Sequence, residues 1–448
     1  MREEESMIQQ LKEWLREGDF AKVRKELEPL RSADIADCML EMEPKEVLLV
    51  FSILPKELSA EVFSHFSASE KKHLVEAFTD EETLDLLLHM QMDDRVDLLE
   101  ELPANLVNRL LSLTEPSLRQ EINMYLGYDE ESAGGVMTSE FVAIRKDLTI
   151  TEALETFRTS SYARVSSNEL FVTDECWTLE GVVSLKTLLL SPTEAKVAEV
   201  MDGHYVSTTT STDQEAVAKL FMKYDLRAMP VTDNDQRLVG VITVDDVMDV
   251  VVQEQTEDMQ KMAAMTPSEL PYLEQNIWSL SKHRIGWLMI LMVTATITGG
   301  IISSYEDVLS QTVALAIFIP MLMDTGGNAG AQSSTLLIRS IALGQVEFKD
   351  FFKVLWKELR VGLLCGLVLA LLNTIRILMI SDAPLAVAIV VNISIVATVV
   401  FSKVLGGILP ILSDKVGLDP AMMTGPLITT VVDTCALLIY FALASLLL

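Results

Sequence analysis

The sequence has few cysteines and histidines, and neither residue type gathers in one place. Its four cysteines are widely separated and form no C-x-x-C pair, and its five histidines form no cluster. Zinc sites draw on such clusters, so a zinc protein is disfavoured, and scattered cysteines are typical of a reducing compartment. The chain also has no Walker loop, no HExxH sequence and no evident nucleophile–base pair. We therefore expect that it is not an enzyme.

Basic residues are scarce as well, with 35 Lys and Arg against 65 Asp and Glu and a formal net charge of −30. A nucleic-acid partner needs a basic footprint, so none is expected. The deficit is regional: residues 281–448 hold ten acidic and ten basic side chains, and residues 1–280 carry the whole net charge. Like charges at this density destabilise a compact state unless cations screen them. The charged, amphipathic start MREEESMIQQLKEWL does not resemble a signal peptide.

Long apolar runs occur only in the electrically neutral part. The segments long enough to span a bilayer are approximately Ile285–Ser304, Gln311–Ile338, Trp356–Ile380, Leu385–Leu412 and Met422–Leu448. If the N-terminus is inside, nine Lys and Arg residues lie at the inner ends and only Arg376 lies outside. Basic residues collect on the cytoplasmic side of membrane proteins. This pattern predicts a cytoplasmic N-terminal part and an external C-terminus.

Two of these segments carry groups that a bilayer disfavours. Phe318–Ser334 reads FIPMLMDTGGNAGAQSS, and its proline and three glycines predict an interrupted helix. Irregular backbone at membrane depth is tolerated only where it is buried in protein or lines a wet cavity. Gly425–Tyr440 reads GPLITTVVDTCALLIY and places Asp433 among apolar residues. A carboxylate there costs roughly 2.5–3.5 kcal/mol on insertion scales and marks a pathway; the alternative is a hydrogen bond to a neighbouring helix.

Asp433 is interpreted here as a single intramembrane carboxylate in each chain. An odd number of helices with one carboxylate suits a two-fold dimer, in which two Asp433 side chains face each other and hold a divalent cation. Thr429 and Thr430 lie one helical turn away, and Gly425 and Pro426 open the same helix. Small polar neighbours suit Mg²⁺, which keeps several of its waters.

The soluble part begins with a predicted all-helical region up to about Leu126. Helix-start signals recur every 11 to 13 residues, at Pro44, Pro55, Ser67, Thr79, Met92 and Pro103. Such short helices cannot bury their apolar faces alone and stack as a solenoid. Asp93 and Asp97 lie one turn apart in the segment MDDRVDLLEELP. This acidic run is either a solvated face or a cation-binding face.

Residues 132–252 change to short β-branched strands alternating with helices, and they are duplicated. FVTDECWTLEGVVSLKTLL at 171–189 aligns with PVTDNDQRLVGVITVDDVM at 230–248, an offset of 59 residues. The duplication resembles a tandem pair of CBS domains, the small βαββα regulatory modules. That resemblance implies an adenine nucleotide such as ATP at Thr243 and Asp246, whereas Ser184 and Thr187 depart from the pattern. The alternative is a pair of packed modules without a ligand.

A connecting helix is predicted from about Val250 to Leu280, with breaks near Pro267 and Pro271. Carboxylates are dense at its start, at Asp245, Asp246, Asp249, Glu254, Glu257 and Asp258. Such a face is either solvated or, against an acidic solenoid, repulsive without bound cations. Oxygen-only clusters of this kind suit Mg²⁺ or Ca²⁺.

Taken over its whole length, the chain resembles MgtE-type magnesium channels and transporters. Two motifs carry the likeness, P-x-L-x-D-x-G-G-N-A-G-x-Q from Pro320 to Gln332 and G-P-x-x-T-T-x-x-D from Gly425 to Asp433. The resemblance implies a homodimer in the bacterial inner membrane, with hydrated Mg²⁺ bound at Asp433. It also implies that cytosolic Mg²⁺ closes the pore. The pore and motif residues are Pro320, Gly327, Asn328, Gly330, Gln332, Gly425, Pro426, Thr429 and Thr430.

Regulatory metal positions are carried over in the same way, to Asp93, Asp97, Asp246, Asp249, Glu254, Glu257 and Asp258. Asp419 is expected as the membrane-side partner of the linking helix, and Glu215 and Asp225 are weaker candidates. The expected fold is a multidomain membrane protein: an all-α superhelical N domain (1–128), an α/β CBS pair (129–193 and 194–252), a connecting helix (253–280) and five transmembrane helices (281–448). Broader divalent-cation transport and a CBS-regulated secondary transporter, with Asp433 as a proton relay, are the alternatives.

Overall fold

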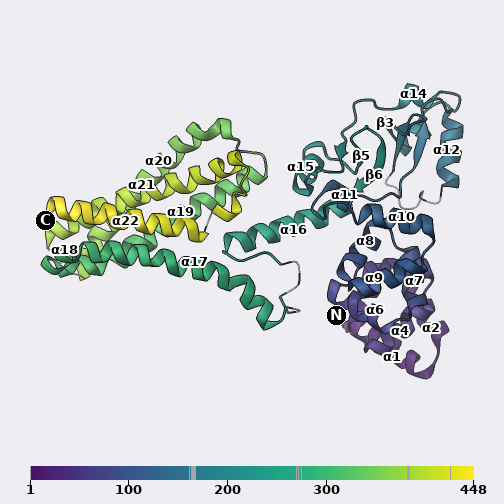
Figure 1. Cartoon of the computed structure of the whole chain (residues 1–448), viewed down its shortest axis with the longest axis horizontal. Helices are drawn as coiled ribbons and strands as arrows, with labels where there is room; N and C mark the ends of the chain where they lie inside the picture. Colours follow the sequence, from purple (N-terminus) through teal and green to yellow (C-terminus); the bar gives the residue numbers. More distant parts are fainter. Residues whose placement is uncertain are drawn as a thin grey trace. The chain divides into compact units, whose positions relative to one another are not determined.

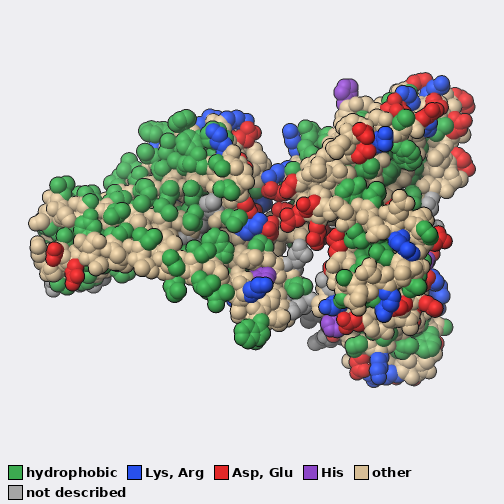
Figure 2. Space-filling view, viewed as in Figure 1, with side chains coloured by type: hydrophobic (Ala, Val, Ile, Leu, Met, Phe, Trp, Pro, Cys, Tyr) green, Lys and Arg blue, Asp and Glu red, His purple; other side chains and the backbone are tan. Residues whose placement is uncertain are grey.

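The structure is a computed structural model of the chain. It describes residues 2–160, 162, 168–268, 270, 272–273, 275–380, 384–423 and 425–448. The chain divides into two compact units, Met1–Val251 and Val252–Leu448 (Figure 1). We call them the N-terminal unit and the C-terminal unit. Hydrophobic side chains cover much of the visible face of α17–α22, whereas Asp and Glu are scattered over the N-terminal unit and α16 (Figure 2).

The N-terminal unit begins with short helices that start where the sequence predicts. Ser67 and Thr79 each complete a capping box, and Pro44 opens its helix. Pro55 and Pro103 occupy the N-cap position, directly before the first helical residue. The helices are α1 (Arg2–Glu17), α2 (Phe20–Leu27), α3 (Ser32–Leu40), α4 (Pro44–Ile53), α5 (Lys56–Ser64), α6 (Ala68–Ala77), α7 (Asp80–His89), α8 (Met92–Glu101), α9 (Ala104–Leu113) and α10 (Pro116–Tyr125).

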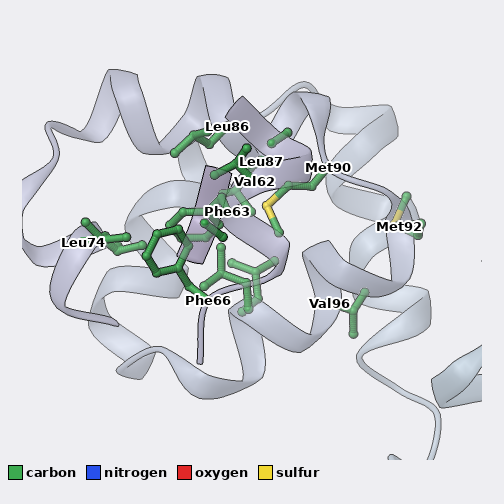
Figure 3. Close-up of a cluster of buried hydrophobic side chains, with 14 of the residues drawn as sticks. Val62, Phe63, Phe66, Leu74, Leu86, Leu87, Met90, Met92 and Val96 are labelled. Carbon is green, nitrogen blue, oxygen red and sulfur yellow. The ribbon is translucent and has the colours of Figure 1, made fainter. Parts of the chain in front are cut away.

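Successive short helices of this region share one apolar core. Phe63 of α5, Leu87 of α7 and Val96 of α8 are almost fully buried, together with Phe66 and Met90 from the connections after α5 and α7 (Figure 3). Each helix of about ten residues presents too little apolar surface to be stable alone, so stacking provides the stability. The predicted helical solenoid is confirmed.

Two three-stranded sheets follow, and they repeat each other almost residue for residue. The first has the order β1-β2-β3 and the second β4-β5-β6; in each, a parallel pair precedes an antiparallel pair. Glu169 pairs with Ser184, and 59 residues later Ala228 pairs with Thr243. The elements are α11 (Ala133–Val136), β1 (Ala143–Arg145), α12 (Ile150–Thr159), β2 (Glu169–Thr173), β3 (Leu179–Ser184), α13 (Leu185–Leu190), α14 (Val197–Val200), β4 (Thr208–Thr209), α15 (Gln214–Tyr224), β5 (Ala228–Thr232) and β6 (Leu238–Thr243). The predicted pair of CBS-like modules is confirmed.

The linking helix differs from the prediction at both ends. It is α16 (Val244–Met262), which begins directly after β6. The last helix of the second module therefore continues without interruption into the linker, instead of giving way to a separate helix near residue 253. The helix ends at Met262, and Ala264 then takes a positive φ of 54°. Residues 263–276 have no regular helix where the structure describes them, so the helix does not extend to residue 280.

The C-terminal unit is built from long apolar helices. Among the described residues, five helical spans are long and apolar enough to cross a membrane. Their large hydrophobic side chains, such as Leu288, Leu364 and Leu371, are widely exposed. The elements are α17 (Ile277–Ser304), α18 (Glu306–Gln311), the 3-10 helix η2 (Val313–Phe318), α19 (Ile319–Ala342), η3 (Phe348–Asp350), α20 (Phe351–Ile380), α21 (Leu385–Val416), η4 (Ala421–Met423) and α22 (Gly425–Leu447).

The prediction that Phe318–Ser334 interrupts its helix is wrong. Pro320 lies in the first turn of α19, where a missing N–H costs no hydrogen bond, and the glycines lie inside one continuous helix. Their role is close packing. A Cβ added to Gly326 would lie 2.7 Å from Thr398 Cγ2 and 2.9 Å from Val432 Cγ1, so the glycine face lets α19 approach α21 and α22.

The tightest of these contacts gives a testable prediction. A Cβ at Gly406 of α21 would lie 2.2 Å from the carbonyl oxygen of Gly330 on α19, and a backbone atom cannot move aside alone. We expect Gly406→Ala to lower the stability of the purified chain by about 1–3 kcal/mol or more. Gly299→Ala, inside α17 with no atom within 4 Å of the added Cβ, is the matched control. Equal thermal unfolding of the two variants in detergent would contradict this packing.

Candidate functional site

Asp433 lies in α22 and faces the glycine surface of α19. A Cβ built on Gly327 would lie 3.9 Å from Asp433 Oδ1 and 3.3 Å from Thr429 Cγ2. Asp433, Thr429 and Thr430 are half-buried in the single chain. The absence of a side chain at Gly327 therefore leaves the Asp433 carboxylate and the Thr429 side chain next to the α19 backbone.

A row of polar side chains runs along the exposed side of α19. Asp324, Asn328 and Gln332 are spaced four residues apart and are all exposed in the single chain. The spacing places them one turn apart on one face, which we call the α19 polar stripe. Asn328 Nδ2 donates a hydrogen bond to Asp324 Oδ1 at 3.0 Å. Lipid cannot satisfy such groups, so the stripe must border water or another protein surface.

Asp324 is a functional candidate that the sequence reasoning missed. Its carboxylate lies close enough to interact electrostatically with Asp433. The interpretation of Asp433 as a single intramembrane carboxylate is therefore wrong, and Glu358, buried in α20, is a further one. The aspartate of the P-x-L-x-D-x-G-G sequence is the signal in the chain that indicates this position. The neighbouring glycines had indicated only an irregular backbone.

The other motif residues have simpler positions. Pro320 begins α19 on the exposed side, and Gly330 is buried where a Cβ would lie 2.9 Å from Ile428 Cγ2. Gly425 and Pro426 begin α22, and their side chains lie outside what the structure describes.

In the N-terminal unit, carboxylates of α8 interact with those at the start of α16. Asp93 Oδ1 is buried without a hydrogen-bond partner. Loss of water contact, followed by the charges of Asp246 and Asp94, raises the pKa of Asp93 well above its usual value. Burial also raises the pKa of Asp246 to about 6, despite its hydrogen bond from Thr243. The pKa of Asp97 rises to about 7 through the same desolvation and the charge of Asp94.

These carboxylates do not form a closed metal cage. Among the described residues, no three His, Cys, Asp or Glu side chains lie together closely enough to hold an ion. Mg²⁺ often binds through one or two carboxylates and retains its other ligands as water. A pair such as Asp93 and Asp246, with one orphaned buried oxygen, fits that mode of binding. Asp94, which belongs to the acidic run MDDRVDLLEELP, is part of the same group. Desolvation raises the pKa of Asp94 against the opposing charge of Lys71, and the charge of Asp249 adds to the rise.

Glu215 and Asp225 are not brought together. They lie at opposite ends of α15, where Glu215 is in the first turn and Asp225 is the C-cap residue with a φ of 51°. Glu215 forms an ion pair with Lys219 at 3.0 Å. Asp225 thus serves locally to end its helix.

Glu257, in the second half of α16, is linked through a lysine to Asp419 in the turn that follows α21. Lys261 Nζ lies 2.7 Å from Glu257 Oε1 and 2.7 Å from Asp419 Oδ2. Burial opposes the charged lysine, but hydrogen bonds to Asp419 and Glu257 outweigh it and raise the pKa of Lys261. Asp419 is thus a partner of the linking helix, and Lys261, which the sequence reasoning did not consider, provides the contact. Glu254 and Asp258 lie on the same helix.

Thr243 and Asp246, the expected nucleotide contacts, are engaged with each other. The Thr243 backbone N–H donates to Asp246 Oδ2 at 3.2 Å, and the Thr243 hydroxyl also bonds to it. The pair closes the first turn of α16. Asp246 also interacts with Asp93, so this one side chain belongs to both the predicted metal site and the predicted nucleotide site.

A polar stripe on a membrane-length helix, in a chain that also carries an acidic N-terminal unit, is typical of a membrane transport protein. Family models match residues 319–443 as MgtE, a divalent cation transporter, 30–131 as the MgtE intracellular N domain, and 133–192 and 197–253 as CBS domains. The chain belongs to the MgtE family. It is 37% identical over 449 residues to the magnesium transporter MgtE of Thermus thermophilus, covering 99% of both chains.

Further relatives and solved structures agree. The magnesium transporter MgtE of Bacillus subtilis is 35% identical over 80% of this chain and 78% of its own. Among solved structures, the cytosolic domain of the Mg²⁺ channel MgtE in complex with ATP is 36% identical, with a TM-score of 0.50 over 54% of this chain and 98% of its own. The soluble part of a magnesium transporter is 28% identical, with a TM-score of 0.54 over 56% of this chain and 99% of its own.

Proposed function

We propose that the chain carries Mg²⁺ across a membrane, down its electrochemical gradient and into the cell. The observation that carries this proposal is the α19 polar stripe, exposed on a membrane-spanning helix beside Asp433 of α22. Carboxylate, amide and hydroxyl oxygens at close range suit a hydrated divalent cation. The membrane potential supplies about 2.3 kcal/mol per charge per 100 mV, hence about twice that for a dication.

The stripe also supports a homodimer. A polar row with one carboxylate, exposed in one chain at membrane depth, needs either water or another protein surface against it. A two-fold axis beside α19 and α22 provides both, because two copies of Asp324 and Asp433 then face one aqueous path. The excess of Lys and Arg at one end of the spanning helices favours a cytoplasmic N-terminal unit and an external C-terminus, as in a bacterial inner membrane.

The electrostatic interaction of Asp93 with Asp246, and of Asp97 with Asp94, supports regulation by cytosolic Mg²⁺. Asp93 and Asp246 are half-buried, and Asp97 is exposed. Asp93 and Asp246 repel each other when both are ionised, and a bound Mg²⁺ replaces this repulsion by attraction. An ion that binds better to the packed arrangement shifts the equilibrium towards it. We propose that this arrangement is the closed one, with Glu254, Glu257, Asp258, Asp419 and Asp249 as further regulatory carboxylates. ATP at Thr243 and Asp246 is a second proposed ligand.

Uptake into liposomes that contain the purified full-length chain tests the transported ion. We expect Mg²⁺ uptake that increases with an inside-negative potential, because a dication moves down the field. A broader divalent-cation transporter would carry Co²⁺, Ni²⁺ and Mn²⁺ at comparable rates. Uptake that follows an imposed pH gradient and ignores internal Mg²⁺ would reject the channel and favour a proton-coupled transporter.

A further inference from the structure

A second group of charged side chains is buried inside the C-terminal unit, against the face of α19 that packs on α20 and α21. Glu358 of α20 and Lys403 of α21 are each 6% exposed, and Ser333 of α19 is 3% exposed. Ser333 donates a hydrogen bond from Oγ to Glu358 Oε2 at 2.7 Å. The Lys403 ammonium lies 3.4 Å from Ser333 Oγ and donates to it. The hydroxyl thus accepts from the lysine and donates to the carboxylate, joining three helices.

The lysine also reaches the α19 polar stripe. Its ammonium lies 3.4 Å from Gln332 Oε1 and 3.4 Å from the carbonyl oxygen of Ala329. On the other side, α21 provides space for the carboxylate at Gly407, where a Cβ would lie 2.7 Å from Glu358 Cγ. The missing side chain at Gly407 thus lets Glu358 pack against α21, and Lys403 contacts the α19 polar stripe from its buried side.

Neither charge is expected in the buried interior of the helix bundle without the other. An isolated charge within a bilayer is costly, and removing one member of a buried pair leaves the other uncompensated. We propose that Lys403 and Glu358 are a counter-charge pair, joined through Ser333, that holds α19 against α20 and α21 and positions Gln332. They are positioning residues, because both are buried behind the stripe and act on it through the contact of Lys403 with Gln332. The consequence for transport rests on the proposed function, whereas the pairing does not.

The pairing predicts opposite effects of its two single neutralisations. Glu358→Gln leaves an uncompensated positive charge behind the stripe, which disfavours a dication in the path. Lys403→Met leaves a negative charge there, which favours the dication. In liposomes with the full-length chain, we expect the Mg²⁺ concentration for half-maximal uptake to rise several-fold in the first variant and to fall in the second. The double variant Glu358→Gln/Lys403→Met should return close to the wild-type value.

Thermal unfolding of the same proteins in detergent provides a readout that does not depend on transport. Each single variant should melt well below the wild type, and the double variant should recover most of the loss. If a single variant does not fold, the melting temperatures of the double variant and of Ser333→Ala still test the pairing of Lys403 with Glu358. Ser333→Ala should destabilise more than Ser394→Ala, because the hydroxyl of Ser394, also buried in α21, donates to the Val390 carbonyl oxygen of its own helix and, within the described residues, joins no second helix.

The results that would overturn the pairing are specific. They are a double variant no more stable than the weaker single variant, or half-maximal Mg²⁺ concentrations that move in the same direction in both single variants. Equal melting of Ser333→Ala and Ser394→Ala would also count against it. If the wild type does not carry Mg²⁺, the proposed function fails, and the unfolding comparison still tests the pair.

Discussion

Asp433→Asn should reduce Mg²⁺ uptake to the level of empty liposomes, at least about tenfold below the wild type. The substitution keeps the size and polarity of the side chain and removes only its charge. The carboxylate lies in α22 beside Gly327 and Thr429, where protein surrounds it partly and where it interacts with Asp324. A dication that enters this path from water finds few other negatively charged side chains to stabilise it. Each tenfold decrease in uptake corresponds to about 1.4 kcal/mol of lost stabilisation.

The matched control is Asp307→Asn, which makes the same chemical change at an exposed position of α18. We expect it to transport at the wild-type rate. Asp324→Asn should fall between the two, with uptake retained but a higher Mg²⁺ concentration needed for half-maximal rate, because one of the two neighbouring charges remains. Undiminished uptake by correctly folded Asp433→Asn would remove Asp433 from the ion path.

Without Mg²⁺, the N-terminal unit should lose stability as the pH rises from about 4 to 7. The folded-state pKa of Asp246 is about 6 and that of Asp97 about 7, both above the usual value of an aspartate side chain. A carboxyl group whose pKa is raised by folding holds its proton in the folded state, so its stabilising contribution is complete below the unfolded pKa and disappears as the pH passes the folded one. For Asp246 the loss is on the order of 2 kcal/mol by pH 7.

Asp246→Asn isolates this effect from the other carboxyl groups. The amide keeps an oxygen that can accept from Thr243 N–H, while the repulsion with Asp93 disappears. At pH 7 without Mg²⁺ the variant should be more stable than the wild type, and the difference should vanish near pH 4. Added Mg²⁺ should stabilise the wild type more than the variant. Protease resistance and thermal unfolding of the full chain measure both the pH effect and the Mg²⁺ effect. Asp34→Asn, at an exposed position, is the control. A wild type that does not respond to millimolar Mg²⁺ would reject the sensor.

Local sequence signals gave the helix starts of the solenoid correctly, because a capping residue acts on its own first turn. Thr79 and Ser67 need only the glutamate three residues later. The internal duplication likewise predicted two modules, and the strand registers repeat at the same spacing. The bounds of α16 were not predictable in this way. Nothing in the local sequence separates the last module helix from the linker, and the chain simply continues through both.

Sequence alone also determined that apolar segments follow an acidic region and that Asp433 lies inside one of them, since length, charge and hydropathy are properties of the chain itself. Only the tertiary structure decided what the glycines of α19 do and which carboxylates are neighbours. Gly326 and Gly330 could equally break a helix or admit a close partner, and the choice depends on Thr398, Val432 and Ile428 of other helices. The approach of Asp324 to Asp433, and of Lys403 to Glu358 through Ser333, arises from packing between segments distant in sequence, which no periodicity records.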